Sequence, residues 1–170
     1  MSKADINGTI EGATNSTVHN IAFLGFDGVQ LLDLIGPLEA FKLVNTPDGD
    51  PRYNTFIVSN KPVFTSGTGV SVVADKLFTE PQTIDTLVVP GGEGTREPEI
   101  SRAMKSWLKQ QFDRTQRVLS ICTGIFLLAD QPYLAGREVA THWAFSALLQ
   151  SQNPQLKVNH ERLFIKQGKF

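Results

Sequence analysis

The stretch that decides the fold is RVLSICTGIFLLAD, residues 117–130, because its pattern changes in the middle. RVLSI is a short apolar run, typical of a strand buried on both faces of a sheet. CTGIFLLAD has its apolar residues at helical spacing and is closed by Pro132. The sequence therefore places its single cysteine, Cys122, on a tight turn between a strand and a helix.

Two further apolar runs lie upstream and predict two more buried strands. IAFLGF, residues 21–26, is closed by the turn signal Asp27-Gly28. TLVVP, residues 86–90, is closed by the glycine-rich run 91–94. Because glycine lets the backbone turn sharply, we expect a loop at the carboxyl end of this strand.

Helical spacing follows these strands. Residues 31–44 and 99–112 each carry an apolar face, and the segment 143–149 repeats the pattern. Since proline lacks a backbone N–H, we expect Pro37 in the first turn of the main helix rather than in its interior.

The remaining segments are short. YNTFIVS (53–59), two pieces within 61–75 and RLFIK (162–166) predict strands nearer the margins of the sheet. The polar residues 1–19 have little apolar surface to offset the entropy of ordering and predict a flexible N-terminal arm.

Strands that alternate with helical segments predict an α/β fold, with a mainly parallel sheet and helices on both faces. Ligands of such sheets bind beyond the carboxyl ends of the strands, where the Gly91-Gly92 loop and Cys122 are both expected. The length of 170 residues, with 41% hydrophobic and 19% charged residues, suits one globular domain, which we place over residues 20–170.

Composition also limits the function. No apolar run approaches bilayer length, and the net charge of −1 lacks the basic excess of a nucleic-acid binder. One cysteine cannot form an intramolecular disulfide, and the polar N-terminal segment lacks the apolar core of a signal peptide. We therefore expect a cytoplasmic domain that contacts neither membrane nor DNA by itself.

Cys122 is the leading candidate for chemistry. A strand-to-helix turn lifts a side chain clear of the sheet, and a helix N-terminus lowers the pKa of a thiol through its unpaired N–H groups. The alternative is a small buried hydrophobe. The position at the turn favours a reactive thiol, and redox sensing through a sulfenic acid is a weaker alternative.

Other residues are candidates to support this thiol. The amides of Gly91 and Gly92 are suited to stabilise a developing oxyanion, although the glycines could simply end the strand. Asp33, an acid among apolar residues, could cap the helix begun near Pro37 or share a proton with the thiol. Glu39 competes for that proton, although a solvated helix face suits it better.

His142 follows Cys122 by twenty residues and is a candidate base, since a Cys/His pair is the usual way to make a thiolate. A ring packed near Trp143 and hydrogen-bonded to backbone explains the residue equally well. His19, in the arm, and His160 add no regular spacing, so we predict no metal and no other cofactor.

Four blocks, in order along the chain, carry a resemblance to a known family: QLLDLIGPLEAF (30–41), DTLVVPGGEG (85–94), VLSICTGIFLLAD (118–130) and YLAGREVATHWAF (133–145). On these blocks the chain resembles the ThiJ/PfpI superfamily, whose flavodoxin-like three-layer sandwich is the fold of the class I glutamine amidotransferases. Within it, two groups look most similar: the N-terminal domains of AraC-type transcriptional regulators and the isonitrile hydratases. The tail, residues 153–170, looks more like the regulators.

The resemblance implies that Cys122 is the elbow nucleophile, that Asp33 is the acid beside it and that Thr123 also takes part, as in the hydratases. It implies that the amides of Gly91 and Gly92 face the cysteine. Together with His142, these residues form the expected ligand site. PfpI-type peptidases have histidine where this chain has Thr123, and no His/Glu pair matches that of the glutaminases, so we expect neither activity.

Two hypotheses follow. The first is a sensing domain of an AraC-type regulator, which holds a small metabolite near Cys122 and biases a homodimer. Its DNA contact would come from C-terminal helix-turn-helix motifs beyond Phe170. The family's closing strand and helix also lie beyond that residue, so we expect a truncated domain whose open edge favours pairing with another copy. The second hypothesis is a cysteine-dependent isonitrile hydratase.

Overall fold

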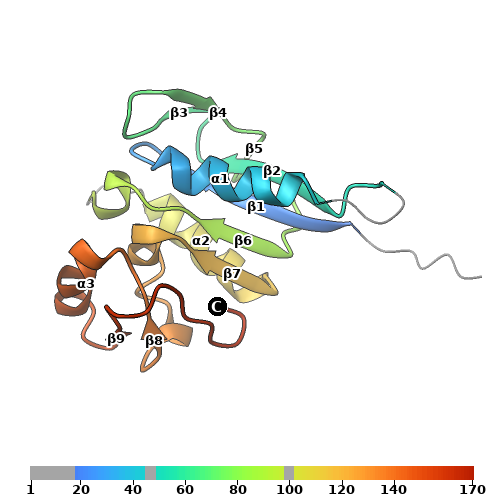
Figure 1. Ribbon diagram of the computed structural model, residues 1–170. Helices are drawn as coiled ribbons and strands as arrows, with labels where there is room; N and C mark the ends of the chain where they lie inside the picture. The colour runs from blue at the N-terminus through green and yellow to red at the C-terminus, as the bar shows by residue number, and fades with distance from the viewer. Residues whose placement is uncertain (1–17, 45–48, 98–101) are drawn as a thin grey trace, which may run out of the picture.

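The structure, a computed structural model, describes residues 18–44, 49–97 and 102–170 (Figure 1). Most of the predicted arm, residues 1–17, lies outside the described residues. The prediction that His19 belongs to this arm is wrong, because His19 begins the first strand, β1 (His19–Gly25). Its Nε2 lies 2.8 Å from Oγ1 of Thr86 on a neighbouring strand, which ties it to the sheet.

A parallel sheet forms the centre of the domain, as the alternating pattern predicted. Within the described residues its strand order is β5-β2-β1-β6-β7. Besides β1, the sheet contains β2 (Tyr53–Ser59), β5 (Lys76–Leu77), β6 (Thr86–Val89) and β7 (Arg117–Ser120). Phe23 of β1 pairs with Ile57 of β2 and Val88 of β6. The three apolar runs of the sequence thus lie side by side, and their carboxyl ends meet at one edge.

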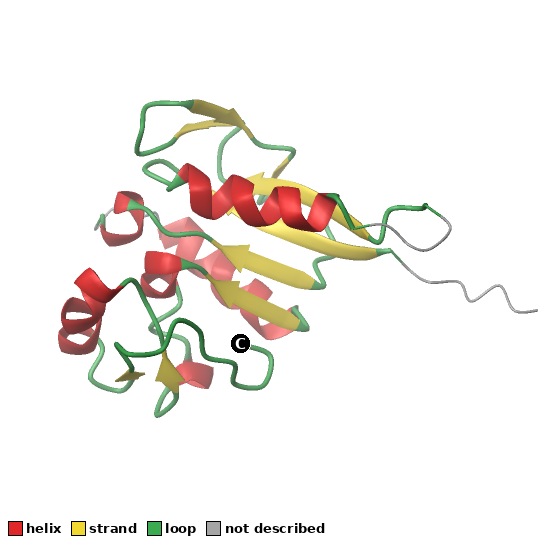
Figure 2. Cartoon of the chain, in the orientation of Figure 1, coloured by secondary structure: helices red, strands yellow, loops and turns green. Residues whose placement is uncertain are grey.

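Helices cover both faces of this sheet, which confirms the three-layer α/β fold. Figure 1 shows α1 (Leu31–Lys42) on the face toward the viewer and α2 (Arg102–Arg114) behind the sheet; Figure 2 shows the same layers by type. The shorter helices are η1 (Glu93–Arg96), η2 (Cys122–Leu127), η3 (Pro132–Leu134), η4 (Trp143–Phe145) and α3 (Ser146–Gln152). None of the helices in the described ranges has the length and apolar character that a bilayer crossing requires.

The hydrophobic core lies on the central strands. Leu24, Leu87 and Val88 have no exposed surface, and burial of such side chains contributes roughly 1.5–3 kcal/mol each. Trp107 of α2 stacks on Phe78 with ring centroids 4.3 Å apart. These contacts fix the helical layer against the sheet and hold the strand ends in place.

Two small sheets flank the centre. β3 (Val63–Thr65) and β4 (Ser71–Val73), the two pieces expected within 61–75, pair antiparallel, and β8 (Glu138–Val139) pairs in parallel with β9 (Lys157–Val158). The strand predicted at 162–166 is wrong, because this described segment is irregular. Leu163 is 100% exposed and Phe164 is 82% exposed. Strand propensity depends on packing of the side chains against neighbouring strands, and these side chains stay in solvent. The propensity of the segment was therefore not sufficient to form a strand.

The position of Pro37 differs from the prediction. α1 begins at Leu31, and Pro37 therefore lies in the helix interior. The start is set by Asp33 and Leu34, whose N–H groups both donate to the carbonyl of Gln30. Hydrogen bonds upstream of Pro37 thus decide where the helix begins. Because proline has no backbone N–H, the helix lacks one backbone hydrogen bond at this position.

The segment after Cys122 forms a 3₁₀ helix, η2, instead of the predicted α-helix. Its bonds span three residues, with the Gly124 N–H donating to the carbonyl of Ile121 at 2.9 Å. A Cβ on Gly124 would lie 2.1 Å from the carbonyl oxygen of Val89. Glycine thus lets this turn pack backbone to backbone on β6, a contact that apolar spacing does not reveal.

Candidate functional site

Cys122 lies on a sharp turn directly after β7. Among the described residues it is the one non-glycine residue with a positive φ, 54°. This conformation costs roughly 1–2 kcal/mol, so neighbouring groups must hold it. The Ile121 N–H donates to the carbonyl of Val89 at 3.0 Å, and Oγ1 of Thr141 donates to the carbonyl of Cys122 at 3.0 Å. The structure has the predicted strand-to-helix turn, and the cysteine is only partly buried.

The Asp33 carboxylate lies beside this thiol. Its negative charge acts on the Cys122 thiol, and its Oδ2 accepts the Gly91 N–H at 3.2 Å. Asp33 lies in the first turn of α1, whose N-cap is Gln30, so the prediction that Asp33 caps the helix is wrong. The other alternative, a proton shared with the thiol, fits this arrangement. Glu39, the competing acid, is exposed, as its solvated-face alternative predicted.

Backbone contacts between two loops fix Asp33 relative to the cysteine. The loop before α1 and the glycine loop after β6 form an antiparallel bridge at Val29 and Gly92. The Gln30 N–H donates to the carbonyl of Gly91 at 2.9 Å. A Cβ on Gly92 would lie 2.1 Å from the carbonyl oxygen of Gly28, and the φ of Gly92 is +134°. Glycine is therefore required here, and we call residues 27–33 and 91–96 the loop frame.

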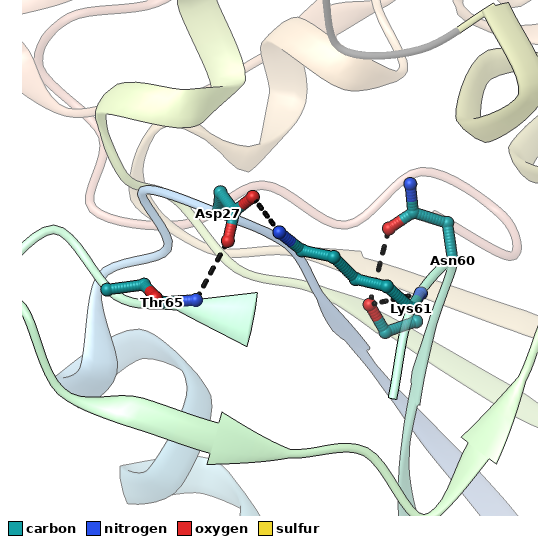
Figure 3. A network of polar contacts seen from close by, with 5 residues as sticks. Asp27, Asn60, Lys61 and Thr65 are labelled. Carbon is teal, nitrogen blue, oxygen red and sulfur yellow. Dashed lines mark hydrogen bonds and ion pairs between the residues drawn. The ribbon is translucent and has the colours of Figure 1, made fainter. Parts of the chain in front are cut away.

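A polar network anchors the loop frame to the β3–β4 hairpin (Figure 3). Asp27 pairs with the Lys61 ammonium, and its Oδ1 accepts the Thr65 N–H at 2.8 Å. The hydrogen bonds from Lys61 and Thr65 hold the pKa of the Asp27 carboxyl below its usual value. Both ends of the ion pair are about half exposed, so solvent screening limits its contribution to about 1 kcal/mol or less.

The Thr123 hydroxyl connects the thiol to the glycine loop. Thr123 is buried, and its Oγ1 accepts the Gly92 N–H at 3.0 Å. The same oxygen lies 3.2 Å from the carbonyl oxygen of Gly92 and 3.1 Å from Oγ1 of Thr95. The hydroxyl also acts to lower the pKa of the Cys122 thiol. The residue after the cysteine thus influences the thiol while it is bonded to the glycine loop.

The backbone amides at the site are arranged differently from the expectation. Gly91 and Gly92 were expected to offer their N–H groups to an oxyanion, but these groups donate to Asp33 and Thr123. The amide that lowers the pKa of the Cys122 thiol is that of Thr123. An oxyanion role for the two glycines requires their present bonds to break and stays a prediction.

Burial raises the pKa of the Cys122 thiol, and the negative charge of Asp33 raises it further. The backbone N–H and hydroxyl of Thr123 lower this pKa but do not outweigh the other two causes. The prediction of a lowered pKa is wrong, because burial and the negative charge of Asp33 both act in the opposite direction. At neutral pH the thiol therefore keeps its proton, which it can share with Asp33.

His142 lines the same cavity as Cys122, but its ring makes other contacts. Its Nδ1 accepts the Ala144 N–H at 3.3 Å, which caps η4, and the ring stacks on Trp143 with centroids 5.5 Å apart. This is the packed, backbone-bonded ring that the sequence analysis gave as the alternative to a catalytic base.

A cavity of about 650 Å³ opens beside Cys122. Its walls are the edge strand β7, the segment 140–143 and much of the C-terminal segment 160–170. Asp33, Gly91 and Gly92 do not belong to the described residues that line this cavity. They therefore lie near the thiol without forming the cavity walls. The expected pocket between Cys122, Asp33 and the glycine loop is therefore displaced toward β7. The course of the C-terminal segment depends on tertiary packing, which explains why sequence patterns did not indicate these walls.

Two threonines of the site were not predicted. Thr141 donates to the carbonyl of Cys122, and Thr95 contacts the hydroxyl of Thr123. Their positions, one before His142 and one just after the glycine run 91–94, are the signals that could have found them. Within the described ranges, no three His, Cys, Asp or Glu side chains lie close enough to hold a metal ion.

The model of the DJ-1/PfpI family matches residues 19–168 of the chain. The chain belongs to the DJ-1/PfpI family. This confirms the family that the four sequence blocks predicted. A Streptomyces lividans protein, described as an uncharacterised protein in the cpoL 5′ region, is 36% identical over 136 residues, which are 80% of this chain and 96% of that protein.

Two further DJ-1/PfpI relatives have described functions. The isonitrile hydratase of Pseudomonas putida is 31% identical over 129 residues, covering 76% of this chain and 54% of the hydratase. The HTH-type transcriptional regulator GbdR of Pseudomonas aeruginosa is 25% identical over 158 residues, covering 92% of this chain and 42% of GbdR. The chain thus spans about half the length of these two relatives.

A solved DJ-1/PfpI structure shows the same fold. The ThiJ/PfpI family protein from Pseudomonas syringae superposes with a TM-score of 0.75 at 21% sequence identity, covering 99% of this chain and 67% of that chain. The flavodoxin-like architecture expected from the resemblance is therefore confirmed.

Proposed function

We propose that this DJ-1/PfpI chain is the ligand-sensing domain of an AraC-type transcriptional regulator and binds a small metabolite beside Cys122. The observation that carries the proposal is the cavity of about 650 Å³ against the thiol, a volume typical of small-molecule sites. The similarity to GbdR over nearly the whole chain supports the regulatory class.

Cys122 acts in this proposal as a contact for the ligand. Because burial and Asp33 raise its pKa, the thiol is neutral at physiological pH and offers a polarisable surface at the end of the cavity. His142 and Trp143 add exposed rings to the same wall. A ligand held between these groups and the C-terminal segment would draw that segment toward β7.

A homodimer is part of the proposal. On α1, Leu32 is 75% exposed and Ile35 is 37% exposed, and Leu43, the C-cap of this helix, is 75% exposed, which leaves an apolar surface suited to pairing. Ligand-dependent movement of the C-terminal segment would bias such a dimer. DNA contact belongs to a helix-turn-helix segment outside this chain, and the cytoplasm is the expected compartment.

A thermal-shift screen against a library of small polar metabolites tests the sensing proposal. Ala140→Phe fills the cavity from its wall, whereas Ala147→Phe places the same side chain on an exposed position of α3. We expect a metabolite that raises the melting temperature of the wild type and of Ala147→Phe but not of Ala140→Phe. A metabolite that stabilises all three proteins equally would bind elsewhere and would contradict the proposal.

The second candidate function is hydration of an isonitrile. The observation that favours it is that Asp33 and Thr123 both act on the pKa of the Cys122 thiol, since these are the three residues that the resemblance to the hydratases implies. The similarity to the Pseudomonas putida isonitrile hydratase supports this alternative.

The reaction can be balanced on these residues. The sulfur of Cys122 bonds to the terminal carbon of the isonitrile, and the thiol proton, passed through Asp33, goes to the same carbon to give a thioimidate. Water then adds to that carbon, the C–S bond breaks and a proton returns to the sulfur. The product is an N-substituted formamide, the isonitrile plus one water.

Incubation of the purified chain with a simple isonitrile decides between the two functions. A hydratase forms the formamide with the wild type and loses at least about a hundredfold in rate in Cys122→Ala, since the nucleophile is gone. Equal rates for the two proteins would dismiss catalysis and leave the sensing proposal.

A further inference from the structure

The charged side chains that line the cavity beside Cys122 are mostly positive. The chain as a whole is nearly neutral, with 16 Lys and Arg residues against 17 Asp and Glu residues. The described residues that line the cavity include one carboxylate side chain, Glu161, and the cations Arg117, Arg162, Lys166 and Lys169. The fold therefore gathers positive charge around this cavity, although the composition shows no excess of it.

One of these cations is already bound within the fold. The Lys169 ammonium donates to the carbonyl of Phe112 and lies 4.6 Å from the centroid of that ring. Within the part of the chain that the structure describes, the side chains of Arg117, Arg162 and Lys166 have no ion pair and no hydrogen bond. All three are exposed. Unpaired charges that line a concave site are available to a ligand.

The negative charge of Asp33 acts on the Cys122 thiol, at the opposite end of β7 from Arg117. Arg117 begins this strand and Cys122 comes five positions later, a separation of about 16 Å at the usual rise of about 3.3 Å per residue. This separation exceeds the Debye length of about 8 Å at physiological ionic strength. An anion bound near Arg117 is therefore largely screened from Asp33.

The cavity lining also carries exposed aromatic rings. Trp143 is 77% exposed and Phe164 is 82% exposed, and both line the cavity. Aromatic rings bind other rings in offset or edge-to-face arrangements, with an energy beyond that of apolar burial. The lining thus offers ring surfaces for the apolar part of a ligand as well as cations for its charge.

The polar groups of the cavity suit a carboxylate better than a phosphate. The planar guanidinium groups of Arg117 and Arg162 can each donate two parallel hydrogen bonds to the two oxygens of a carboxylate. Phosphate sites in α/β folds usually add backbone N–H groups from a glycine loop. In this chain the N–H groups of Gly91 and Gly92 are bonded to other side chains, and neither glycine lines the cavity.

We propose that the ligand of this cavity is an aromatic carboxylate. Its carboxylate group binds the cations Arg117, Arg162 and Lys166, and its ring packs against Trp143 and Phe164. The inference rests on the proposed function, because it names the ligand class of the same sensing site. It predicts a selectivity for negative charge that the volume of the cavity alone does not give.

A titration of Trp143 fluorescence with phenylacetate tests this proposal. The sequence holds two tryptophans, and the other, Trp107, is 7% exposed, so Trp143→Phe serves to remove the signal from the cavity. We expect phenylacetate to bind at least about tenfold more tightly than phenylacetamide, which keeps the ring and lacks the charge. Butyrate, which keeps the charge and lacks the ring, and phenyl phosphate should also bind more weakly than phenylacetate.

Two double variants with the same loss of charge locate the binding site. Arg162→Gln/Lys166→Gln removes two cations from the cavity, whereas Lys109→Gln/Arg114→Gln removes two from exposed positions of α2 that do not line it. We expect the first to weaken phenylacetate binding by about tenfold without changing that of phenylacetamide, and the second to bind both as the wild type does. Should the cavity variant unfold, Arg117→Gln removes another cation of the same set and makes the same measurement.

Equal affinities for phenylacetate and phenylacetamide would overturn the inference, as would tighter binding of phenyl phosphate, equal losses in the two double variants or no response of Trp143. The sensing proposal can fail separately. A metabolite without a carboxylate that stabilises the wild type but not Ala140→Phe would overturn the ligand class and leave the sensing proposal in place. Charge-selective binding of phenylacetate, together with a metabolite screen in which no compound depends on the cavity, would leave the ligand class in place and contradict the sensing proposal.

Discussion

The two sides of Cys122 are built differently. The loop frame is held by backbone bonds such as that from the Gln30 N–H to the Gly91 carbonyl, and a Cβ has no room at Gly92. On the cavity side, the C-terminal segment 160–170 exposes Leu163 completely and is joined to β7 by the Val118 N–H, which donates to the Lys169 carbonyl at 2.8 Å. A rigid frame positions the thiol and its acid, and an open wall leaves room for a ligand.

Of the substitutions that test this contrast, the one at Gly92, in the loop frame, should lower the free energy of unfolding most. Gly92→Ala would place a methyl group against the Gly28 carbonyl at a φ that L-residues rarely adopt, and should lower the free energy of unfolding by about 3 kcal/mol or more. Gly69→Ala is the matched control, since its φ is +83° but nothing lies within 4 Å of the added Cβ; it should cost only about 1 kcal/mol. Urea unfolding measures both, and equal losses would mean that the frame is not tightly packed.

Loss of the Asp27 carboxylate, which anchors the loop frame to the β3–β4 hairpin, should have a smaller, pH-dependent effect on the free energy of unfolding. The folded-state pKa of Asp27 is lowered by Lys61 and Thr65, so its contribution is present above the unfolded pKa, about 4, and is lost as the pH falls through the folded value. Asp27→Asn should cost at most about 1 kcal/mol at neutral pH, and the difference from the wild type should shrink below about pH 4.

Unfolding of both proteins at a series of pH values gives this comparison, with the exposed Asp130→Asn as the control for loss of a carboxylate. A difference between wild type and Asp27→Asn that stayed constant across acid pH would show that the network in Figure 3 contributes through shape and not through charge.

The smallest effect on the free energy of unfolding is expected for a substitution in the C-terminal segment 160–170, on the cavity side of the thiol. Leu163→Ser removes an apolar side chain that is already in solvent and should change the free energy of unfolding by less than about 0.5 kcal/mol. A loss above about 2 kcal/mol in chemical denaturation would mean that this segment is packed in solution and that the two sides of the thiol are alike.

The parts of the molecule that depend on local pattern could be predicted from the sequence. The apolar runs at 21–26, 86–90 and 117–121 form β1, β6 and β7, because burial on both faces leaves a continuous apolar signature. The turn at Cys122 also followed from its place between a strand and a helical pattern.

The predictions from sequence that were wrong concern features that depend on contacts between segments far apart in the chain. The start of α1 depends on bonds at Gln30, and the short turn after Cys122 depends on how closely Gly124 approaches β6. The direction of the thiol pKa was wrong because it depends on burial and on the charge of Asp33, which lies about ninety positions earlier in the chain. The occupancy of the Gly91 amide by that same carboxylate likewise needed coordinates.

The pairing of Cys122 with Asp33 is the central claim, and the alkylation of Cys122 against pH in the wild type and in Asp33→Asn tests it most directly. We expect the wild-type thiol to titrate above the usual value of a free cysteine, and its apparent pKa to be lower in Asp33→Asn because the negative charge that raises it is gone. A wild-type thiol already ionised at neutral pH, or one whose titration is the same in both proteins, would contradict it.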